Sequence, residues 1–545
     1  GSTRTYTRGG VVRKNPVDKR RIVVAGFTGN HNVRRGGVDH GTFDWNGEGL
    51  WFPHTDLTEH VAAHEPDFLF FSGDNVYEGA SPTRPDREHP WLDYLYKWYL
   101  WCWAFRDLAK NIPTVAIPDD HDVYHGNVWG AGGRHAESND DGGYTMPADW
   151  VNMVQRTQTS NLPEPYDPTP VEQGIGVYYT SIDYGGVSFA VLEDRKFKSS
   201  PTVMVPAGKI VNGWAQNPDF DPVTQADVPG AVLLGDRQLA FLEDWAADWT
   251  GGARFKAVLS QTVFSNVATL PAEAGSDAVV PGLKRLTADD YPSNDEPVAD
   301  ADSNGWPQSG RNRALRAMRK GFAFHLSGDQ HLGSTIHYGV DDWNDAGYAL
   351  CVPSIANYFP RRWYPKMPGR NHRPGMPRYT GEYLDGFGNK MTVLAVSNPL
   401  ATGRKPALLH DKAPGYGIVR FDKVERTVTI ECWPRWADPR EPGAKQYPGW
   451  PIVTTQEDQY GRKAAAWLPT VRVTGMTDPV VQVIDEADGE IVYTLRIEGN
   501  SWRPKVFRKG TYTVKVGEQG TARIRTFTGV RSVGEGSTET IEAAF

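Results

Sequence analysis

Four short polar clusters in this sequence carry residue types that bind metal ions or move protons. Asp74 stands alone after a glycine, and residues 119–122 are Asp-Asp-His-Asp. Gln261 ends a third apolar run, and Asp329-Gln330-His331 follows a fourth. Burying several carboxylates together is very costly unless cations neutralise them. The clusters therefore predict a metal site.

The chemistry that such a site could perform is hydrolysis of a phosphoester. Two cations about 3.5–4 Å apart can hold a phosphoryl group and turn a bridging water into hydroxide. Asp74 suits a ligand shared by both ions. The donors are rich in oxygen, poor in histidine and free of thiolate, which favours iron(III), manganese or calcium over a purely zinc site. A phenolate from Tyr77 would favour iron(III) at one position.

Short apolar runs must position these clusters, because each cluster follows such a run. Continuous apolar runs of this length are typical of strands buried on both faces. Helix-like segments alternate with them, which predicts an α/β layered domain whose ligands lie beyond the carboxyl ends of the strands. The predicted strands are 21–27, 67–73, 113–117, 188–193, 255–260 and 321–327. The predicted helices are 55–64, 91–110, 236–247 and 308–320.

Long segments rich in Gly, Pro, Asn and Asp interrupt this pattern at 126–176, 199–230 and 271–310. A further insertion at 357–379 carries aromatic residues and arginines. Loops of this length in a compact domain are more often lids or binding loops than neutral connectors. The aromatic insertion either lines a substrate cleft or packs onto the domain.

The pattern of apolar and polar residues changes after about residue 440. Alternating apolar residues and turn signals predict a small β-sandwich at 463–545. We expect an N-terminal extension at 1–19, a catalytic domain at 20–440, a linker at 441–462 and this accessory domain. Gly1 and Ser2 indicate an expression remnant, so the start of the chain gives no information on export.

Composition excludes several classes of protein. The 545 residues are 39% hydrophobic and 23% charged, with a net charge of −8 and mixed charge signs along the chain. This argues against a surface that binds nucleic acid. No apolar run reaches the roughly 20 residues of a transmembrane helix. Three scattered cysteines exclude a disulfide framework and a cysteine zinc site, although one disulfide stays open.

The clusters resemble, in order, the motifs of the metallophosphoesterases, and within them the alkaline phosphatase D (PhoD-like) branch. The matching segments are GDNVYEG at 73–79, PDDHD at 118–122, LSQTVFSN at 259–266 and LSGDQHLGS at 326–334. LEDRKFK at 192–198 and NGWPQSGRNR at 304–313 also correspond to segments of that branch. The resemblance spans about residues 20–435 and implies two packed β-sheets flanked by helices.

The resemblance also implies roles for single residues. Asp74 would bridge two metals, Tyr77 and His331 would bind the first, and Asp120 and Asp329 the second. His121 would be the catalytic histidine, which stabilises the transition state or protonates the leaving group. The remaining candidates are Gln261 near the second metal, Arg195 as a phosphate clamp, and His125 and Asn127 as substrate contacts.

One motif departs from the family. The first strand should be followed by Asp-x-His or by a Cys, yet residues 26–31 read Gly-Phe-Thr-Gly-Asn-His. Asn30 is our expected substitute ligand, and His31, Asp39 and His40 are the other candidates. The first metal site is therefore rebuilt, weakened or selective for another ion.

We expect a phosphodiesterase or alkaline phosphatase that uses a metal-bound hydroxide at a dinuclear site. The expected ions are iron(III) with calcium, with manganese or zinc as alternatives. The expected substrate is a small-molecule, lipid or nucleotide phosphoester, and the resemblance implies a periplasmic or secreted enzyme. Two rivals stay open: a degenerate scaffold that acts as a binding protein, and a metallohydrolase for another ester or a lactone.

Overall fold

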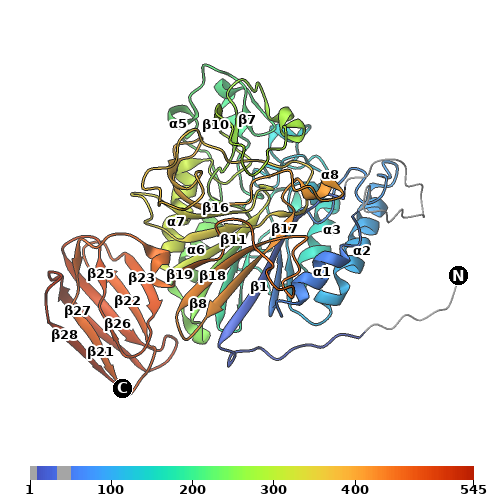
Figure 1. Ribbon diagram of the computed structural model, residues 1–545. Helices are drawn as coiled ribbons and strands as arrows, with labels where there is room; N and C mark the ends of the chain where they lie inside the picture. Colours follow the sequence, from blue (N-terminus) through green and yellow to red (C-terminus); the bar gives the residue numbers. More distant parts are fainter. Residues whose placement is uncertain (1–8, 33–50) are drawn as a thin grey trace.

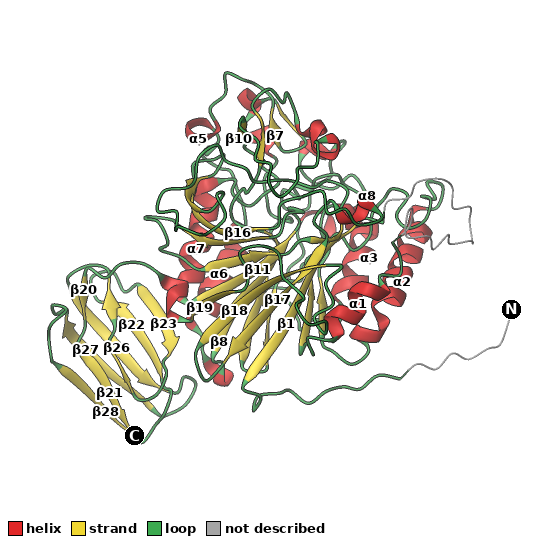
Figure 2. Ribbon diagram, in the orientation of Figure 1, coloured by secondary structure: helices red, strands yellow, loops and turns green. Residues whose placement is uncertain are grey.

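The computed structural model describes residues 9–32 and 51–545, so the candidates Asp39 and His40 lie outside the described residues. Its main body is a pair of stacked β-sheets with helices on both outer faces (Figure 2). This arrangement confirms the predicted α/β sandwich. A smaller all-β domain follows at the C-terminal end of the chain (Figure 1).

The first sheet has seven strands, in the order β19-β18-β17-β1-β2-β3, with β14 also paired to β1. Strands β1, β2 and β3 run parallel, so their carboxyl ends meet at one edge. The antiparallel strands β17, β18 and β19 extend the sheet on the other side. The bounds are β1 Arg21–Asn30, β2 Phe68–Phe71, β3 Thr114–Ala116, β14 Ser354–Ala356, β17 Gly415–Asp422, β18 Thr427–Pro434 and β19 Ile452–Thr455.

The second sheet has eight strands, in the order β15-β16-β12-β13-β11-β8-β5-β4. Its centre is parallel, because β5, β8, β11 and β13 share one direction. The bounds are β4 Thr180–Tyr184, β5 Val187–Val191, β8 Phe255–Thr262, β11 Ala323–Gly328, β12 Ser334–Tyr338, β13 Tyr348–Cys351, β15 Gly381–Leu384 and β16 Lys390–Val396.

The core lies in three layers because alternate residues of each buried strand face opposite ways. In β1, Ile22 and Val24 point between the two sheets, where they join Phe189 and Leu259 of the second sheet. Phe27 of the same strand belongs to the outer layer beneath the helices. Both faces of the central strands are therefore covered, which explains their continuous apolar runs.

The helices cover the outer faces. Helices α1 and α2 pack on the first sheet, and α6 and α7 pack on the second. The bounds are α1 Thr55–Ala62, α2 Pro90–Ala109, α3 Ala148–Thr159, α6 Gly235–Ala247 and α7 Gln308–Lys320. Among the described residues, none of the helices combines the length and the apolar character needed to cross a bilayer.

The long insertions gather at one end of the sheets, at the top of Figure 1. They contain short elements, and the first insertion also contains α3, which the sequence pattern does not predict. The short elements are α4 Pro201–Met204, β6 Ile210–Val211, β7 Trp214–Ala215, α5 Pro222–Gln225, β9 Thr269–Pro271 and β10 Asp295–Pro297, and α8 Ala407–His410 lies later in the chain.

The C-terminal domain has its own core, to which Trp249 and Phe322 of the main body contribute. Its main sheets have the orders β24-β21-β28 and β23-β22-β26-β27. The bounds are β20 Ala466–Trp467, β21 Thr470–Thr474, β22 Val480–Asp485, β23 Ile491–Arg496, β24 Ser501–Trp502, β25 Lys505–Val506, β26 Thr511–Gly517, β27 Ile524–Arg531 and β28 Thr540–Ala544.

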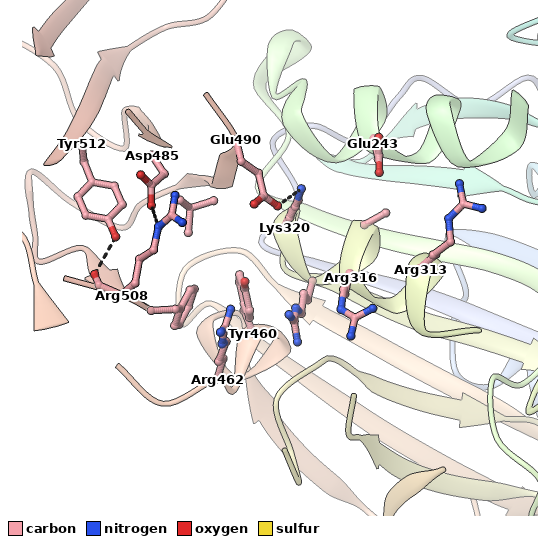
Figure 3. Close-up of a pocket in the computed structure, with 14 residues that line it drawn as sticks. Glu243, Arg313, Arg316, Lys320, Tyr460, Arg462, Asp485, Glu490, Arg508 and Tyr512 are labelled. Carbon is pink, nitrogen blue, oxygen red and sulfur yellow. Dashed lines mark hydrogen bonds and ion pairs between the residues drawn. The ribbon is translucent and has the colours of Figure 1, made fainter. Parts of the chain in front are cut away.

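The junction between the domains combines the apolar contacts of Trp249 and Phe322 with hydrogen bonds and ion pairs. Arg496 of β23 donates to the backbone oxygens of Trp249 and Ala253 in the main body, at 3.0 and 2.8 Å. A cavity of about 390 Å³ lies beside this junction. Figure 3 shows the basic, acidic and aromatic side chains that line it, most of them from α7 and the C-terminal domain and one, Glu243, from α6. Lys320 of α7 pairs there with Glu490 at 2.8 Å.

The predicted elements correspond closely to the observed ones. Each of the six predicted strands overlaps an observed strand, and the helix 308–320 has the bounds of α7. The antiparallel strands β15 to β19 have no counterpart among the predicted strands. Residues 441–462, expected to form a linker, contain β19, which pairs with β18 at the edge of the first sheet. The three cysteines are free.

Candidate metal centre

Glycines bring the ends of three strands close enough to form one site. A Cβ on Gly73, which has φ +114°, would lie 2.3 Å from Cβ of Asp119. A Cβ on Gly328 would lie 2.2 Å from Oγ of Ser72. Only glycine permits this spacing. The Gly-Asp pairs of the sequence are therefore points of close backbone approach, each followed by a candidate ligand.

The residues after these glycines have a left-handed backbone. Asp74, Asp329 and His331 have φ of 57°, 66° and 54°. Non-glycine residues in this region are uncommon and are found disproportionately at functional sites. The amide of Asp329 donates to Oγ1 of Thr28 at 3.0 Å, which joins the end of β11 to the end of β1. The two sheets thus present their polar ends together.

Asp74, Tyr77 and His331 form the tightest group of donors. Oη of Tyr77 donates to Oδ2 of Asp74 at 2.6 Å, and Nε2 of His331 lies 3.3 Å from the same oxygen. The distance from Oη of Tyr77 to Nε2 of His331 is 3.4 Å. One carboxylate, one phenol and one imidazole therefore converge on a single point, and all three are buried.

Asp120 and His121 extend this group. Ligand atoms of Asp74, Asp120 and His121 lie within 4.8 Å of one another, as do those of Asp119, Asp120 and Asp329. Asp120 caps the short 3-10 turn His121–Val123 by accepting from the amide of His121. His121 is the partly exposed member of the cluster, and its Nδ1 lies 2.9 Å from Oε2 of Glu78.

Arg195 occupies the centre of a second group of carboxylates. Its guanidinium pairs with Asp119, Asp302 and Asp329, each at 2.7 Å, and its side chain is 2% exposed. Nε and Nη1 hydrogen-bond to Asp119 and Asp302, whereas Nη2 lies 2.7 Å from Asp329 without a hydrogen bond among the described residues. The buried guanidinium thus neutralises buried carboxylates, and the role of Arg195 as a phosphate clamp stays a prediction.

The residues fit a bound cation. Oδ1 of Asp74, Oδ2 of Asp119 and Nδ1 of His331 are buried without a hydrogen-bond partner among the described residues. Burial, with repulsion from Asp74, raises the pKa of Asp120 well above its usual value. Burial also raises the pKa of Asp119, although Arg195 opposes the shift. Carboxylates that are crowded and unsatisfied in this way are a signature of a cation site.

The electrostatics around His121 favour its charged form. Burial lowers the pKa of the imidazole, but the carboxylates of Glu78, Asp120 and Asp74 outweigh it and raise the pKa well above 6.5. Burial raises the pKa of Tyr77 well above 10, and Asp74 raises it further. Without a cation, Tyr77 is thus a neutral phenol that donates to Asp74.

Asp122 holds the two loops of the cluster together. Its carboxylate accepts from the amides of Val76 and Asp119, both at 2.9 Å, and from Nε2 of Gln158 at 2.8 Å. It therefore orients the loops that carry Asp74 and Asp120 without belonging to the donor cluster. Asp122, the last residue of the Asp-Asp-His-Asp motif, therefore has a structural role.

Gln261 and Asn30, two of the expected ligands, have their side chains engaged outside the donor cluster. Gln261 donates to the carbonyl of Pro118 and to Oη of Tyr178, at 3.0 and 2.8 Å. Oδ1 of Asn30 lies 2.7 Å from Nε2 of His54 and accepts from Asn32. Both side-chain amides hydrogen-bond to buried polar groups, as most buried amides in proteins do.

His125 and Asn127, the residues expected to contact the substrate, also hydrogen-bond within the protein. Nε2 of His125 accepts from the amide of Thr145 at 3.0 Å, and the histidine is fully buried. Asn127 donates to Oδ1 of Asn212 at 2.9 Å, which joins the first insertion to the second. These two residues therefore anchor insertions near the site.

His31 lies beside the cluster. Its ring stacks on Tyr77 with 4.4 Å between centroids, and Tyr358 of the aromatic insertion lies 5.0 Å from it. Burial, with repulsion from His121 and His331, lowers the pKa of His31 to about 3. A neutral imidazole thus occupies the position after the altered first motif.

Sequence reasoning missed Glu78 and Asp302. Glu78 lies inside a quoted motif, four residues after Asp74, and its carboxylate pairs with Nδ1 of His121. Asp302 lies in a long insertion with no local pattern around it. Its carboxylate joins Arg195 to Arg361, at 2.7 and 2.9 Å, across more than a hundred residues from Arg195.

One family model matches this chain. The family model of PhoD-like phosphatases matches residues 46–357, which is more than half of the chain. No curated protein matches. A solved structure titled "Structure of PhoD" is 13% identical and covers 81% of this chain and 71% of its own, with a TM-score of 0.48. A dimetal phosphatase from Danio rerio is 8% identical, with 79% and 99% covered and a TM-score of 0.39.

Proposed function

Because this chain belongs to the PhoD-like phosphatase family, we propose that it hydrolyses phosphoesters at the cluster around Asp74, Asp120 and His331. One observation carries the proposal. Carboxylate, phenol and imidazole donors converge at the carboxyl ends of parallel strands, and a buried oxygen of Asp74 has no partner among the described residues. Such a site needs a cation, and the family supplies the reaction.

We assign the donors to two ions. Asp74 is the shared ligand, Tyr77 and His331 belong to the first ion, and Asp120 and Asp329 belong to the second. The oxygen-rich donors favour iron(III) beside Tyr77 and calcium at the second position. Bound cations would supply Lewis acidity and lower the pKa of a coordinated water.

His121 is proposed to give a proton to the leaving oxygen. Its Nδ1 faces Glu78, which leaves the other ring nitrogen for the substrate. Its side chain is 24% exposed, so an incoming ester can reach it, whereas the ligand residues around it are buried. A histidine oriented by a carboxylate in this way is suited to general acid catalysis.

Arg195 is proposed as a positioning residue. By pairing with Asp119 and Asp329 it fixes the second group of carboxylates, and Asp302 connects it to the insertions. Asp329 is thus shared between a guanidinium and a candidate ion. The charge of Arg195 offsets part of the repulsion that would otherwise spread these loops apart.

We favour phosphodiesters over monoesters as substrates, because a second substituent would have the aromatic insertion to contact. Tyr358 of that insertion is 43% exposed and its ring lies 5.0 Å from His31. A small-molecule, lipid or nucleotide diester fits this description. The resemblance to exported phosphatases favours a periplasmic or secreted location.

The test is metal content and turnover in matched proteins. Wild type, Asp74→Asn and the control Asp219→Asn, an exposed carboxylate outside the cluster, are analysed by elemental mass spectrometry. Hydrolysis of bis-p-nitrophenyl phosphate and p-nitrophenyl phosphate is then measured. We expect Asp74→Asn to lose at least one bound metal and about 100-fold or more of activity, whereas Asp219→Asn keeps both.

Three outcomes count against the proposal. A folded wild type that binds no metal and turns over neither compound, even with iron, manganese and calcium supplied, would favour a binding scaffold. Faster hydrolysis of p-nitrophenyl acetate or a lactone than of either phosphoester would favour the alternative function, a metallohydrolase for another ester or a lactone. A higher rate for the monoester would reject the diester preference alone.

A further inference from the structure

A second cavity lies outside the metal centre. Its volume is about 510 Å³, within the range of roughly 300–1,000 Å³ that accommodates small ligands. Its walls come from the insertions 271–310 and 357–379, from α8 and from residues 434–448. None of the residues that line it belongs to the donor cluster around Asp74.

Five aromatic side chains, four tyrosines and one tryptophan, contribute to the wall. Tyr379 and Tyr447 donate their hydroxyls to the carbonyls of Val396 and Pro414, at 3.1 and 2.9 Å. Trp436 packs edge-on against Tyr447, with 5.9 Å between centroids. These hydrogen bonds and ring contacts hold the rings in place. The cavity is therefore preformed, which lowers the entropic cost of binding.

Two polar atoms in the wall lack partners. Tyr364 is 3% exposed, and its hydroxyl has no hydrogen-bond partner among the described residues. Nδ1 of His410 in α8 is also buried and has no hydrogen-bond partner among the described residues. Both residues line the cavity. Buried polar atoms without partners are rare in native proteins, so these two mark an unusual feature of the residues around the cavity.

The rim is cationic. Arg378 stacks on Tyr291 at 4.2 Å, and Lys445 is exposed beside Tyr447. Neither forms an ion pair with a carboxylate in the described part of the chain. Asp290, also at the rim, already accepts from the amide and hydroxyl of Thr287, both at 2.9 Å. These hydrogen bonds lower the pKa of Asp290 and keep it ionised. Two cations thus face one carboxylate, and the net charge at the mouth is positive.

We propose that this cavity binds a small aromatic anion. The ring would lie between the aromatic side chains of the wall. The carboxylate, sulfonate or phosphate would lie at the rim near Arg378 and Lys445. The apolar wall favours the ring, and the two cations favour the negative charge. This inference does not depend on the proposed phosphoesterase activity.

The probe is 1-anilinonaphthalene-8-sulfonate, whose fluorescence rises in apolar pockets. We expect saturable binding at one site in the wild type. Charge reversal by Arg378→Glu or Lys445→Glu should weaken binding at least about tenfold, because an attraction becomes a repulsion. These residues are exposed, so the fold should survive. Trp436→Ala should reduce the fluorescence gain.

Matched controls locate the binding. Arg440→Glu reverses an exposed charge outside the cavity and should leave affinity unchanged. Asp74→Asn and chelation of metals should also leave it unchanged. Absence of saturable binding, equal affinity in the rim variants and the wild type, or loss of binding in Asp74→Asn would each overturn the inference.

Discussion

The donor cluster combines a ligand group with a buried cation of the protein's own. Asp74, Tyr77 and His331 converge within hydrogen-bond distance, whereas Asp119 and Asp329 share the guanidinium of Arg195. Oδ1 of Asp74 and Oδ2 of Asp119 have no hydrogen-bond partner among the described residues, whereas Arg195 offsets part of the negative charge of Asp119 and Asp329.

Arg195→Met should strongly destabilise the metal-free protein. The substitution keeps the side-chain bulk but leaves Asp119, Asp302 and Asp329 buried without their shared cation. Removing one partner of a buried ion pair costs about 3–5 kcal/mol. Urea unfolding in the presence of a chelator measures this. Arg440→Met, at an exposed arginine, is the control and should match the wild type, and a comparably stable Arg195→Met would contradict the prediction.

Stability should fall in acid partly through His325. This fully buried histidine lies between Ser260 and Tyr338, with 2.8 Å to each hydroxyl, and burial lowers its pKa to about 3. The unfolded chain binds the proton near pH 6.5. The contribution of His325 is therefore complete above pH 6.5 and is lost as the pH falls toward 3.

The measurement is the pH dependence of unfolding in His325→Gln and the wild type. The variant should be less stable at pH 7 because its hydrogen bonds are imperfect. Its stability should nevertheless fall less steeply between pH 6 and 4, by up to about 1.4 kcal/mol per pH unit. Parallel curves for the two proteins would show that His325 does not titrate on unfolding.

At the scale of elements, the site depends on how closely three strand ends approach. Gly328 at the end of β11 faces Ser72 after β2 and Thr28 of β1. The hydrogen bond from the amide of Asp329 to Thr28 uses the same approach. A change of backbone spacing here would move Asp329 and His331 relative to Asp74 without altering any ligand.

Gly328→Ala should reduce both activity and stability. The added Cβ would lie 2.2 Å from Oγ of Ser72 and 2.5 Å from Cβ of Thr28, so strands must shift. Overpacking of this kind costs about 1–3 kcal/mol, and we expect metal affinity to fall with it. Metal titration and thermal unfolding test this. Gly282→Ala adds a Cβ with nothing within 4 Å and is the control; similar behaviour of the two variants would disprove a role for spacing.

At the scale of the whole molecule, the C-terminal domain is attached without contributing to the donor cluster. Arg496 is the centre of the attachment, because it bonds to the main-body backbone and pairs with Glu518 of its own domain at 2.7 Å. Arg254 of the main body also pairs with Asp478 of the C-terminal domain. The junction is thus built from cations that bridge the two parts.

Arg496→Met should loosen the domains while leaving catalysis intact. The variant loses the bonds to Trp249 and Ala253 and leaves their carbonyls without this donor. We expect limited proteolysis to cut near residues 456–465 sooner than in the wild type, with unchanged turnover per molecule of intact protein. Lys320→Met removes a more exposed pair and should have little effect. Equal proteolysis of Arg496→Met and wild type would count against this role of the junction.

The sequence alone determined the parts of this protein that are local. Asp74, Asp120, His121, Asp329 and His331 were predictable because each follows a buried apolar run, and parallel strands bring their ends to one edge. Helix 308–320 was predictable because its signals lie within the helix and at its ends. Order along the chain was sufficient in each of these cases.

Only the tertiary structure decided what depends on distant partners. The pairing of Arg195 with Asp302, 107 residues away, has no local signal in the sequence. Gln261 and Asn30 have ligand chemistry, but buried neighbours from other strands use their amides first. The edge strand β19 forms only because β18 lies next to it. Long-range pairing of buried polar groups leaves no local pattern, because each partner is chosen by the whole fold.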